Sequence, residues 1–382
     1  MVSEDVDGLA DVLLDLSHRI HANPELGLAE RKASAWCAEL LSSEGFAVTR
    51  PVAGMETAFR ARRGSGRPVL AFLAEYDALP GVGHACGHNI IAAAAVGAGV
   101  ALARVLDRAG LDGTVLVDGT PAEETSGGKL PMIDEGLYRD VDVALSMHPD
   151  TRDTAGGTCL AVKTLAFAFT GRAAHAAAEP EKGVNALDAV IQTYNNINAL
   201  RQHTRPDVRI HGIITHGGQA PNIVPDYARA EFYVRSAHLD HHKEVLEKVR
   251  NCARGAALAT GARLEMTEEP TFEPIRENAV LCRLALEVMR AFGLDAEDCS
   301  GRCSMGSTDF GNVSQVVPAI APTFKIAPLT VACHHKDFAD AAASADGDAA
   351  VLVAAKVLAV MGARLVLEPD LLRAVRAEFE RK

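Results

Sequence analysis

Residues 69–89 read VLAFLAEYDALPGVGHACGHN. An apolar run typical of a buried strand, Val69–Leu73, leads into a glycine-broken segment with two carboxylates, two histidines and a cysteine. Cys86 and His88 stand one residue apart, so a turn through Gly87 can direct a thiolate and an imidazole at one ion. Zinc prefers ligands of these two types. The stretch therefore predicts a metal-binding loop at the end of a strand.

Strand-like and helical patterns alternate around this loop. The expected elements are a strand over 69–74, a helix over 90–106, a strand over 115–117, a helical stretch over 130–135 and a strand over 141–147. This order predicts an α/β fold with a mixed, mostly parallel sheet sandwiched by helices. Before it, Ser3 is a plausible N-cap for one helix whose apolar spacing runs through Ile20 and ends near Pro24.

The pattern changes between residues 161 and 272. Alternating runs over 164–170, 209–215 and 229–235 predict antiparallel strands, and amphipathic helices are expected over 185–201 and 239–260. The last part of the chain returns to the first style, with helices over 278–292 and 342–360 and strands over 319–326. We therefore predict a discontinuous catalytic domain of residues 1–160 and 273–382, interrupted by an inserted α+β domain of residues 161–272.

Composition narrows the classes of partner. The formal net charge is −12 and no block of lysine and arginine is present, which argues against a nucleic-acid partner. The acidic, amphipathic N-terminus resembles neither a signal peptide nor a transmembrane segment, and the apolar run 90–102 is too short to span a bilayer. Eight cysteines without a CxxC pair suggest free thiols in a reducing compartment. We expect a cytoplasmic protein with no membrane partner.

Other candidate ligands follow strands elsewhere in the chain. Adjacent side chains of an extended segment point in opposite directions, so one member of the pair Glu123-Glu124 can bind an ion while the other accepts a proton from water. His148 follows an apolar strand, and His334-His335 offers two more imidazoles late in the chain. Each signal alone is also compatible with a solvated turn or a structural histidine.

Together these motifs resemble the M20 metallopeptidases, in the amidohydrolase branch where a cysteine replaces a more usual ligand. The matching segments, in family order, are residues 20–26, 76–80 with 84–88, 121–124 with 127–129, 147–149, 171–175, 217–226 and 306–310. The form EYDALPGVGHACGHN is most similar to the sub-branch that cleaves dipeptides or aminobenzoyl-glutamate-like amides. One departure is Asn89, where many relatives carry an aspartate.

The resemblance implies a role for individual residues. It implies metal ligation by Cys86, His88, Glu124, His148 and His334. It implies that Glu123 is the general base and that Asp77 orients a ligand histidine. His334 is preferred to His335 because it has the family's spacing to Phe338. One or two divalent ions are expected, with zinc favoured over manganese, nickel or cobalt.

The inserted domain resembles the family's lid and dimerisation domain. His175 is similar to a histidine that reaches the active site, often that of the partner subunit, to stabilise the oxyanion. Asn222 and Arg235 are similar to contacts of the substrate carboxylate or the oxyanion. The resemblance thus implies a homodimer formed through residues 161–272.

The expected function is metal-dependent hydrolysis of an amide bond in an N-acyl amino acid or a dipeptide-like small molecule. A cysteine hydrolase with Cys86 as nucleophile and His88 as base is a rival, but it gives Glu123, Glu124 and His148 no role. A dinucleotide-binding loop beginning at Gly81 is disfavoured because Cys86 takes the place of its third glycine. A non-catalytic binding protein on the same scaffold is the remaining alternative.

Overall fold

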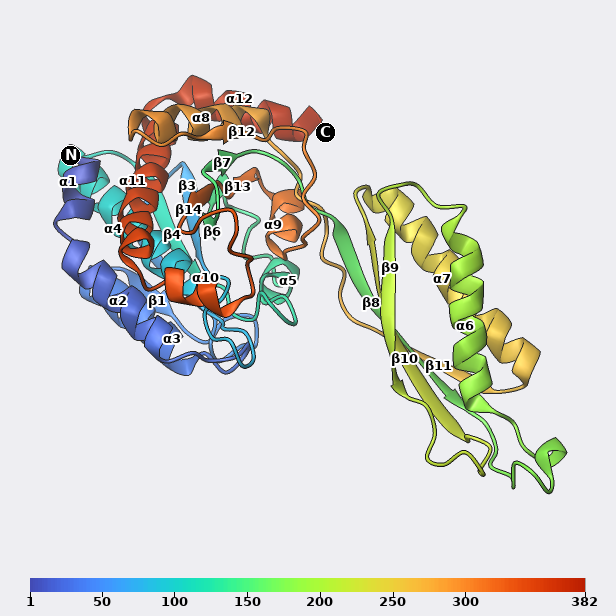
Figure 1. The fold of residues 1–382 in the computed structure, drawn as a ribbon. Helices are drawn as coiled ribbons and strands as arrows, with labels where there is room; N and C mark the ends of the chain where they lie inside the picture. Colours follow the sequence, from blue (N-terminus) through green and yellow to red (C-terminus); the bar gives the residue numbers. More distant parts are fainter. Residues whose placement is uncertain (382) are drawn as a thin grey trace. The chain divides into compact units, whose positions relative to one another are not determined.

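The computed structural model describes residues 1–381 (Figure 1). The chain forms two compact units. Unit 1 comprises Met1–Thr158, Ile275–Ser304 and Thr308–Lys382, and unit 2 comprises Cys159–Pro274 and Met305–Ser307. The chain thus crosses between the units after Thr158 and after Pro274, where the sequence pattern predicts crossings after residues 160 and 272.

A six-stranded mixed sheet forms the centre of unit 1. Its strands, in spatial order, are β1 (Ala47–Thr49), β2 (Phe59–Ser65), β4 (Gly113–Gly119), β3 (Val69–Ala74), β5 (Val143–Leu145) and β13 (Ala319–Ile320). β3 pairs in parallel with β4 and β5, and β13 is parallel to β5, whereas β2 is antiparallel to both of its neighbours. The predicted mixed, mostly parallel sheet is confirmed.

Helices cover both faces of this sheet, and β3 shows why. Its alternate side chains enter two different cores: Leu70 and Phe72 pack with the large core beside α4 (His88–Ala109), whereas Val69, Ala71 and Leu73 pack with the core beside α5 (Lys129–Asp134) and α9 (Phe310–Val316). All six residues of the strand are buried. A strand buried on both faces has the continuous apolar sequence seen here.

The remaining elements of unit 1 are short strands and peripheral helices. A second sheet has the order β12 (Glu297–Asp298), β7 (Thr154–Ala155), β14 (Thr323–Lys325) and β6 (His148–Asp150). The other helices are α1 (Val2–Asp7), α2 (Ala10–Ala22), α3 (Arg31–Ser43), α8 (Ala279–Ala291), α10 (Lys336–Ala341), α11 (Ala345–Leu367) and α12 (Pro369–Arg381).

Two helices are long and apolar enough to cross a membrane, but they contribute to the core. α4 and α11 pack against each other, and 94% of the apolar window of α4 and 61% of that of α11 are buried in the protein. α4 also lies very close to the sheet, because a Cβ placed on Gly99 would be 2.4 Å from a methyl carbon of Val117. The small side chains of α4 therefore serve tight helix–sheet packing.

Several local predictions were wrong. The N-terminal segment forms two helices, α1 and α2, and Ser3 lies inside α1, whose N-cap is Met1. The apolar spacing continues across the break between the two helices, because Val6, Leu9 and Leu13 all belong to the same core. The spacing therefore gave no sign of the break. The sequence pattern also missed α3, β2 and α12. By contrast, Asn278 caps α8, and its side chain accepts a hydrogen bond of 3.1 Å from Leu281 N.

Unit 2 is an antiparallel sheet with two helices on one face (Figure 1). The strand order is β11 (Arg263–Glu268), β8 (Ala161–Thr170), β10 (Tyr227–Ser236) and β9 (Arg209–His216). The helices α6 (Ala186–Arg201) and α7 (Leu239–Thr260) bury Phe167, Phe169 and Phe232 against the sheet, and a short 3₁₀ helix spans Pro180–Lys182. Asn185 caps α6 by accepting from Leu187 N at 2.9 Å.

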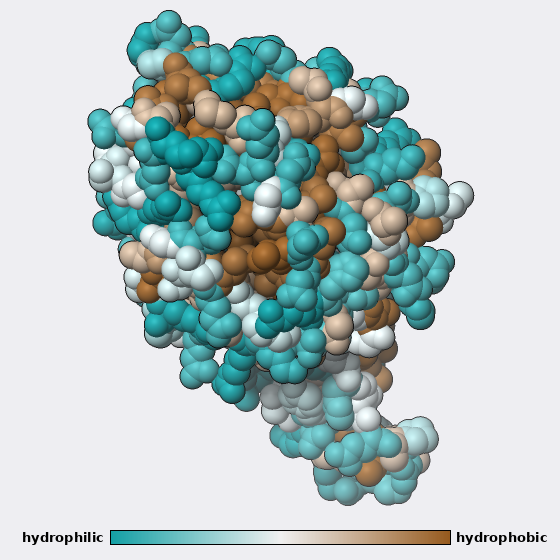
Figure 2. All heavy atoms as spheres, turned by 90° about the vertical axis from the view of Figure 1, so that its left-hand side faces the viewer, coloured by the Kyte–Doolittle hydropathy of each residue, from teal (hydrophilic) through white to brown (hydrophobic). Residues whose placement is uncertain are grey.

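Hydrophilic side chains cover most of the face shown in Figure 2, and hydrophobic side chains gather in patches between them. Apolar side chains are also exposed on the protein, among them Leu26 at 47% and Leu28 at 50%. Scattered exposure of this kind is usual for a folded protein. A buried polar cluster is the more informative feature of the protein.

Candidate metal centre

The loop between β3 and α4 turns sharply just before the helix. Gly87 has φ 75°, and a Cβ placed on it would be 2.7 Å from Cγ of Pro149, so both the backbone conformation and the space require glycine. The turn leaves Cys86 nearly buried and makes His88 the first residue of α4, fully buried. The predicted arrangement of a thiolate and an imidazole about a glycine turn is present.

Asp77 connects the start of α4, which carries His88, with the segment after β4, which carries Glu124. Its Oδ1 lies 2.9 Å from His88 Nδ1, and its Oδ2 accepts a hydrogen bond of 2.9 Å from the backbone amide of Glu124. A carboxylate in this position accepts a hydrogen bond from Nδ1–H of the imidazole, so that Nε2 is the nitrogen available to a metal ion. Asp77 therefore has the geometry of the predicted orienting residue.

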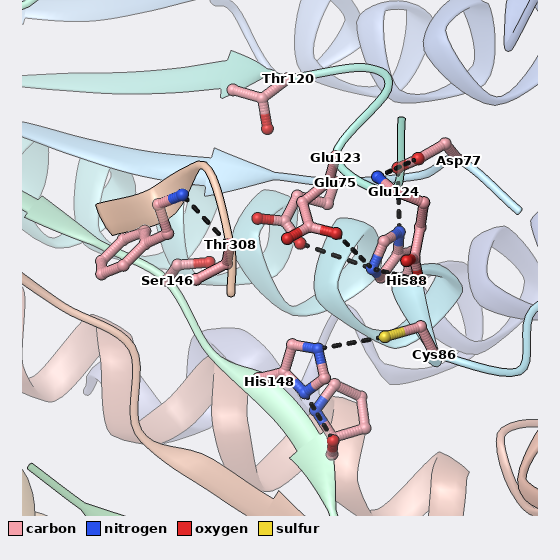
Figure 3. A network of polar contacts seen from close by, with 12 residues as sticks. Glu75, Asp77, Cys86, His88, Thr120, Glu123, Glu124, Ser146, His148 and Thr308 are labelled. Atoms are coloured by element: carbon pink, nitrogen blue, oxygen red, sulfur yellow. Dashed lines mark hydrogen bonds and ion pairs between the residues drawn. The ribbon is translucent and has the colours of Figure 1, made fainter. Parts of the chain in front are cut away.

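Three carboxylates surround the other nitrogen of His88 (Figure 3). His88 Nε2 lies 3.7 Å from Glu75 Oε2, 4.0 Å from Glu123 Oε2 and 3.9 Å from Glu124 Oε1. Burial lowers the pKa of His88, but Asp77, Glu75 and Glu124 together hold that pKa well above its usual value. The negative potential of these carboxylates favours a positive charge at this point.

Two buried polar atoms of this cluster lack a hydrogen bond. They are His88 Nε2 and Glu124 Oε1. Buried polar atoms normally have partners, and an orphaned imidazole nitrogen facing carboxylates is suited to a cation. The residues present therefore fit a divalent metal ion.

Cys86 and His148 form the opposite side of the cluster (Figure 3). Cys86 Sγ lies 3.3 Å from His148 Nε2, and His148 Nδ1 lies 2.6 Å from the carbonyl oxygen of Pro149. That carbonyl fixes the ring with Nε2 turned toward the cysteine. His148 begins the short strand β6 rather than ending β5, which corrects the predicted strand over 141–147.

His334, rather than His335, belongs to the cluster. His334 Nε2 lies 3.4 Å from Glu124 Oε1, and its backbone amide donates to Ala85 O at 2.9 Å. The side chain of His335 instead caps α10 by accepting from Asp337 N. His334 is 55% exposed in its side chain and so lies at the open side of the cluster.

The candidate ligands fall into three overlapping groups, and within each group the ligand atoms all lie within 4.8 Å of one another. These groups are His88 with Glu123 and Glu124, Cys86 with His88 and His148, and Cys86 with Cys333 and His334. The structure thus brings together all five predicted ligands and the predicted base. It also brings in Cys333, which no sequence motif singled out.

Behind the carboxylates lies a buried ionic network that the sequence motifs did not assign. Lys129 Nζ lies 2.8 Å from Glu75 Oε1 and 2.5 Å from Asp309 Oδ1, and all three residues are buried. Burial raises the pKa of Asp309 to about 6, although the lysine opposes this shift. The ammonium compensates the charge of Glu75 and holds it beside His88. The available signal was the position of Lys129 and Asp309 within two of the segments that match the family, residues 127–129 and 306–310.

Glu123 lies between this network and His88. Its side chain is 10% exposed, so it is close to the solvent-accessible edge of the cluster. Burial raises the pKa of Glu123, and the nearby carboxylates of Glu75 and Asp309 raise that pKa further. A carboxylate with a raised pKa is a better proton acceptor than a free one.

The predicted substrate contacts belong to unit 2. The His175 and Asn222 segments are paired there, because Ala176 N donates to Asn222 O at 3.0 Å. Arg235 lies on β10 and donates to Ser307 Oγ at 3.0 Å. Their contacts with a substrate stay predictions.

Comparison with known proteins assigns a family to this arrangement. The family model described as "Peptidase family M20/M25/M40" matches residues 71–362. The chain is 38% identical to the Xaa-Arg dipeptidase of Mus musculus, over 100% of this chain and 91% of that protein. It is 35% identical to one of the subunits of the p-aminobenzoyl-glutamate hydrolase of Escherichia coli, over 73% of this chain and 62% of that protein.

A solved structure shows the same fold. It is that of a dinuclear metal-binding peptidase of the M20 family from Bacillus subtilis, with a TM-score of 0.72 and 22% identity. The superposition covers 94% of this chain and 99% of that chain. At this level of identity the likeness concerns the fold alone.

Proposed function

Because the chain belongs to peptidase family M20/M25/M40 and is a hydrolase, we propose that it cleaves an amide bond of a dipeptide or N-acyl amino acid with the help of a divalent cation. The observation that carries the proposal is the orphaned Nε2 of His88, buried among Glu75, Glu123 and Glu124. A buried imidazole nitrogen that lacks a hydrogen-bond partner and faces three carboxylates is suited to a bound cation, which would offset the repulsion between these negative charges.

The residues that would hold the cation are Cys86, His88, Glu124, His148 and His334. They offer one thiolate, three imidazoles and a carboxylate, a mixed donor set that suits zinc and also admits manganese, nickel or cobalt. When bound, a divalent ion polarises the amide carbonyl and lowers the pKa of water. Because the ligand atoms form overlapping groups that share Cys86 and His88, one or two ions can be accommodated.

Glu123 has the properties of the general base. It is adjacent in sequence to Glu124, whose backbone amide is held by Asp77, so its position is set by the same loop that positions the ligands. We propose that its carboxylate takes a proton from the attacking water and delivers it to the departing amine.

His175 has the tautomer that an oxyanion donor needs. Its Nδ1 accepts from the backbone amides of Ala177 and Ala178 at 3.3 and 3.2 Å. The ring proton therefore resides on Nε2, which can donate to developing negative charge. We propose this role for His175, and we propose that Asn222 and Arg235 contact the oxyanion or the substrate carboxylate.

We further propose that unit 2 joins two copies of the chain as a homodimer. Its edge strand β9 leaves Ile213 66% exposed and Ile214 44% exposed. An unpaired sheet edge bearing exposed branched apolar side chains is a surface that another strand readily covers. Pairing of β9 with its copy in a second chain would satisfy the unpaired backbone edge and cover part of the surface of these isoleucines.

The decisive experiment compares two adjacent glutamates. Glu123→Gln is expected to keep its metal, measured by elemental analysis, and to lose roughly three or more decades of kcat on dipeptides, acyl-amino acids and aminobenzoyl-glutamate, because proton transfer and water activation fail together. Glu124→Gln is expected to lose metal. Nearly wild-type activity of Glu123→Gln would refute the role of Glu123 as the general base. Activity of the wild-type protein after complete removal of metal would refute the metal-dependent mechanism.

A second candidate is a cysteine hydrolase, because Cys86 Sγ lies 3.3 Å from His148 Nε2. The form of this alternative with His88 as the base is disfavoured, since His88 directs its nitrogens at Asp77 and the carboxylates. The contact with Cys333, burial and the nearby Glu124 raise the pKa of Cys86, which disfavours a free thiolate nucleophile. Activity that survives thorough chelation would favour this candidate.

A further inference from the structure

We propose that Cys333 is an additional metal ligand, so that Cys86, Cys333 and His334 form a thiolate-rich half of the site. This inference rests on the proposed metal-dependent function and specifies which ion the site selects. Cys333 lies 247 positions after Cys86 in the chain, yet the two sulfurs are 3.7 Å apart. Sγ of Cys333, Sγ of Cys86 and a ring nitrogen of His334 all lie within 4.8 Å of one another.

The distances between these atoms are those expected for ligands of a shared ion. In a tetrahedral zinc site with Zn–S bonds of about 2.3 Å, two thiolate sulfurs lie about 3.8 Å apart. The observed Cys86–Cys333 separation is 3.7 Å. Ligand nitrogen and oxygen atoms at about 2.1 Å from the ion lie about 3.4 Å apart. The observed separation of His334 Nε2 from Glu124 Oε1 is 3.4 Å.

The backbone is arranged to present both Cys333 and His334. Ala85 O, directly before Cys86, accepts from His334 N at 2.9 Å and from Cys333 Sγ at 3.5 Å. His334 is one of four non-glycine residues with positive φ among residues 1–381, with φ 66°. Such a conformation is unfavourable for a histidine and is retained where the surroundings require it. Here it lets two consecutive side chains face the same cluster.

The second thiolate has a chemical consequence. Thiolates favour zinc and cobalt, whereas magnesium and manganese prefer oxygen donors. With Cys333, the thiolate-rich half offers two sulfurs and the imidazole of His334, and His334 Nε2 in turn lies 3.4 Å from Glu124 Oε1. Without Cys333, an oxygen donor from solvent would take its place. Cys333 is therefore a determinant of selectivity for a thiophilic ion.

The test is the sulfur coordination of bound zinc. Wild type, Cys333→Ser, Cys86→Ser and the control Cys299→Ser are reduced with a phosphine, loaded with zinc and studied by X-ray absorption. Cys299 is a partly exposed thiol outside the candidate ligands. Cys333→Ser is expected to lose sulfur from the zinc shell and to bind zinc at least tenfold more weakly in chelator competition, since changes even to outer-shell groups cost about this much. Cys299→Ser is expected to retain both properties.

The outcomes separate this inference from the proposed function. If folded wild type binds no divalent metal, the proposed function itself fails. If wild type binds zinc and Cys333→Ser has the same sulfur shell and affinity, only the role of Cys333 is overturned. A Cys86–Cys333 disulfide in the reduced, zinc-loaded protein, detected by intact mass, would also overturn it.

Manganese affinity gives a second readout. The ratio of zinc affinity to manganese affinity is expected to be smaller in Cys333→Ser than in wild type. Cys333→Ala provides a check that the serine side chain itself does not bind the ion.

Discussion

Replacement of Asp77 by asparagine tests how the candidate ligands are held. Each carboxylate oxygen of Asp77 accepts one hydrogen bond, from His88 Nδ1 at 2.9 Å and from Glu124 N at 2.9 Å. Asparagine has one acceptor oxygen, so its amide NH₂ group must face one of these two donors. The change therefore removes one charge-assisted hydrogen bond. It also places the amide NH₂ group of the asparagine next to another buried N–H donor, either His88 Nδ1–H or Glu124 N–H.

The expected loss follows from these two contacts. A hydrogen bond to a charged group contributes about 1.5–3 kcal/mol, and only the part that orients the ligands affects the metal. Loss of such an orienting group typically weakens metal binding by about 10–100-fold, equivalent to about 1.4–2.8 kcal/mol. We expect zinc affinity of Asp77→Asn to fall within this range, and hydrolysis at limiting zinc to fall with it.

Asp142→Asn provides a matched control. Asp142 is also buried and also accepts from a backbone amide, Val69 N at 2.7 Å, but it lies at the opposite end of β3 from the metal-binding loop. This variant is expected to be less stable in urea and to keep wild-type zinc affinity. Chelator competition measures the affinity of both variants. Unchanged zinc affinity in a folded Asp77→Asn protein would refute the argument that Asp77 orients the ligands.

Two further predictions concern stability and assembly. Glu30 is fully buried, accepts from Ala122 N at 2.8 Å and has its pKa raised to about 7, chiefly by burial. Because the folded protein holds this proton more tightly than the unfolded chain, the contribution of Glu30 to stability is fully present below about pH 4.5, and up to about 3 kcal/mol of it is lost as pH rises to about 7. Glu30→Gln should flatten this part of the urea-unfolding profile, and an unaltered profile would contradict the assignment. Ile213→Lys on β9 is expected to shift the protein from dimer to monomer in sedimentation at micromolar concentration, whereas a wild-type protein that is already monomeric would exclude the proposed interface.

Much of the fold could be predicted because its decisive segments carry a local signal. The predicted strand over 69–74 coincides with β3, and the predicted helix over 239–260 coincides with α7. In both, burial imposes a pattern that can be read from consecutive residues. Prediction failed where burial is shared between elements: α1 and α2 contribute to one core, so their combined spacing resembles a single helix.

The sequence predicted the chemistry of the candidate site but not every residue that belongs to it. Residue type and motif order identified Cys86, His88, Glu123, Glu124 and His148, and the structure brings them together. Spacing to Phe338 favoured His334, and the structure adds the physical reason, since His335 is engaged in capping α10. Lys129 and Asp309 escaped assignment because an isolated charge in a motif does not reveal which distant charge it pairs with.

Residue chemistry and local periodicity were therefore enough to predict the strand-to-helix loop, the kinds of ligand that it carries and the order of the motifs. Which side chains meet depends instead on tertiary packing. The approach of Cys333 to Cys86, separated by 247 positions, requires the segment that precedes α10 to pack against the loop before α4. No local pattern encodes such a meeting, because it is fixed by the summed packing of the elements between them.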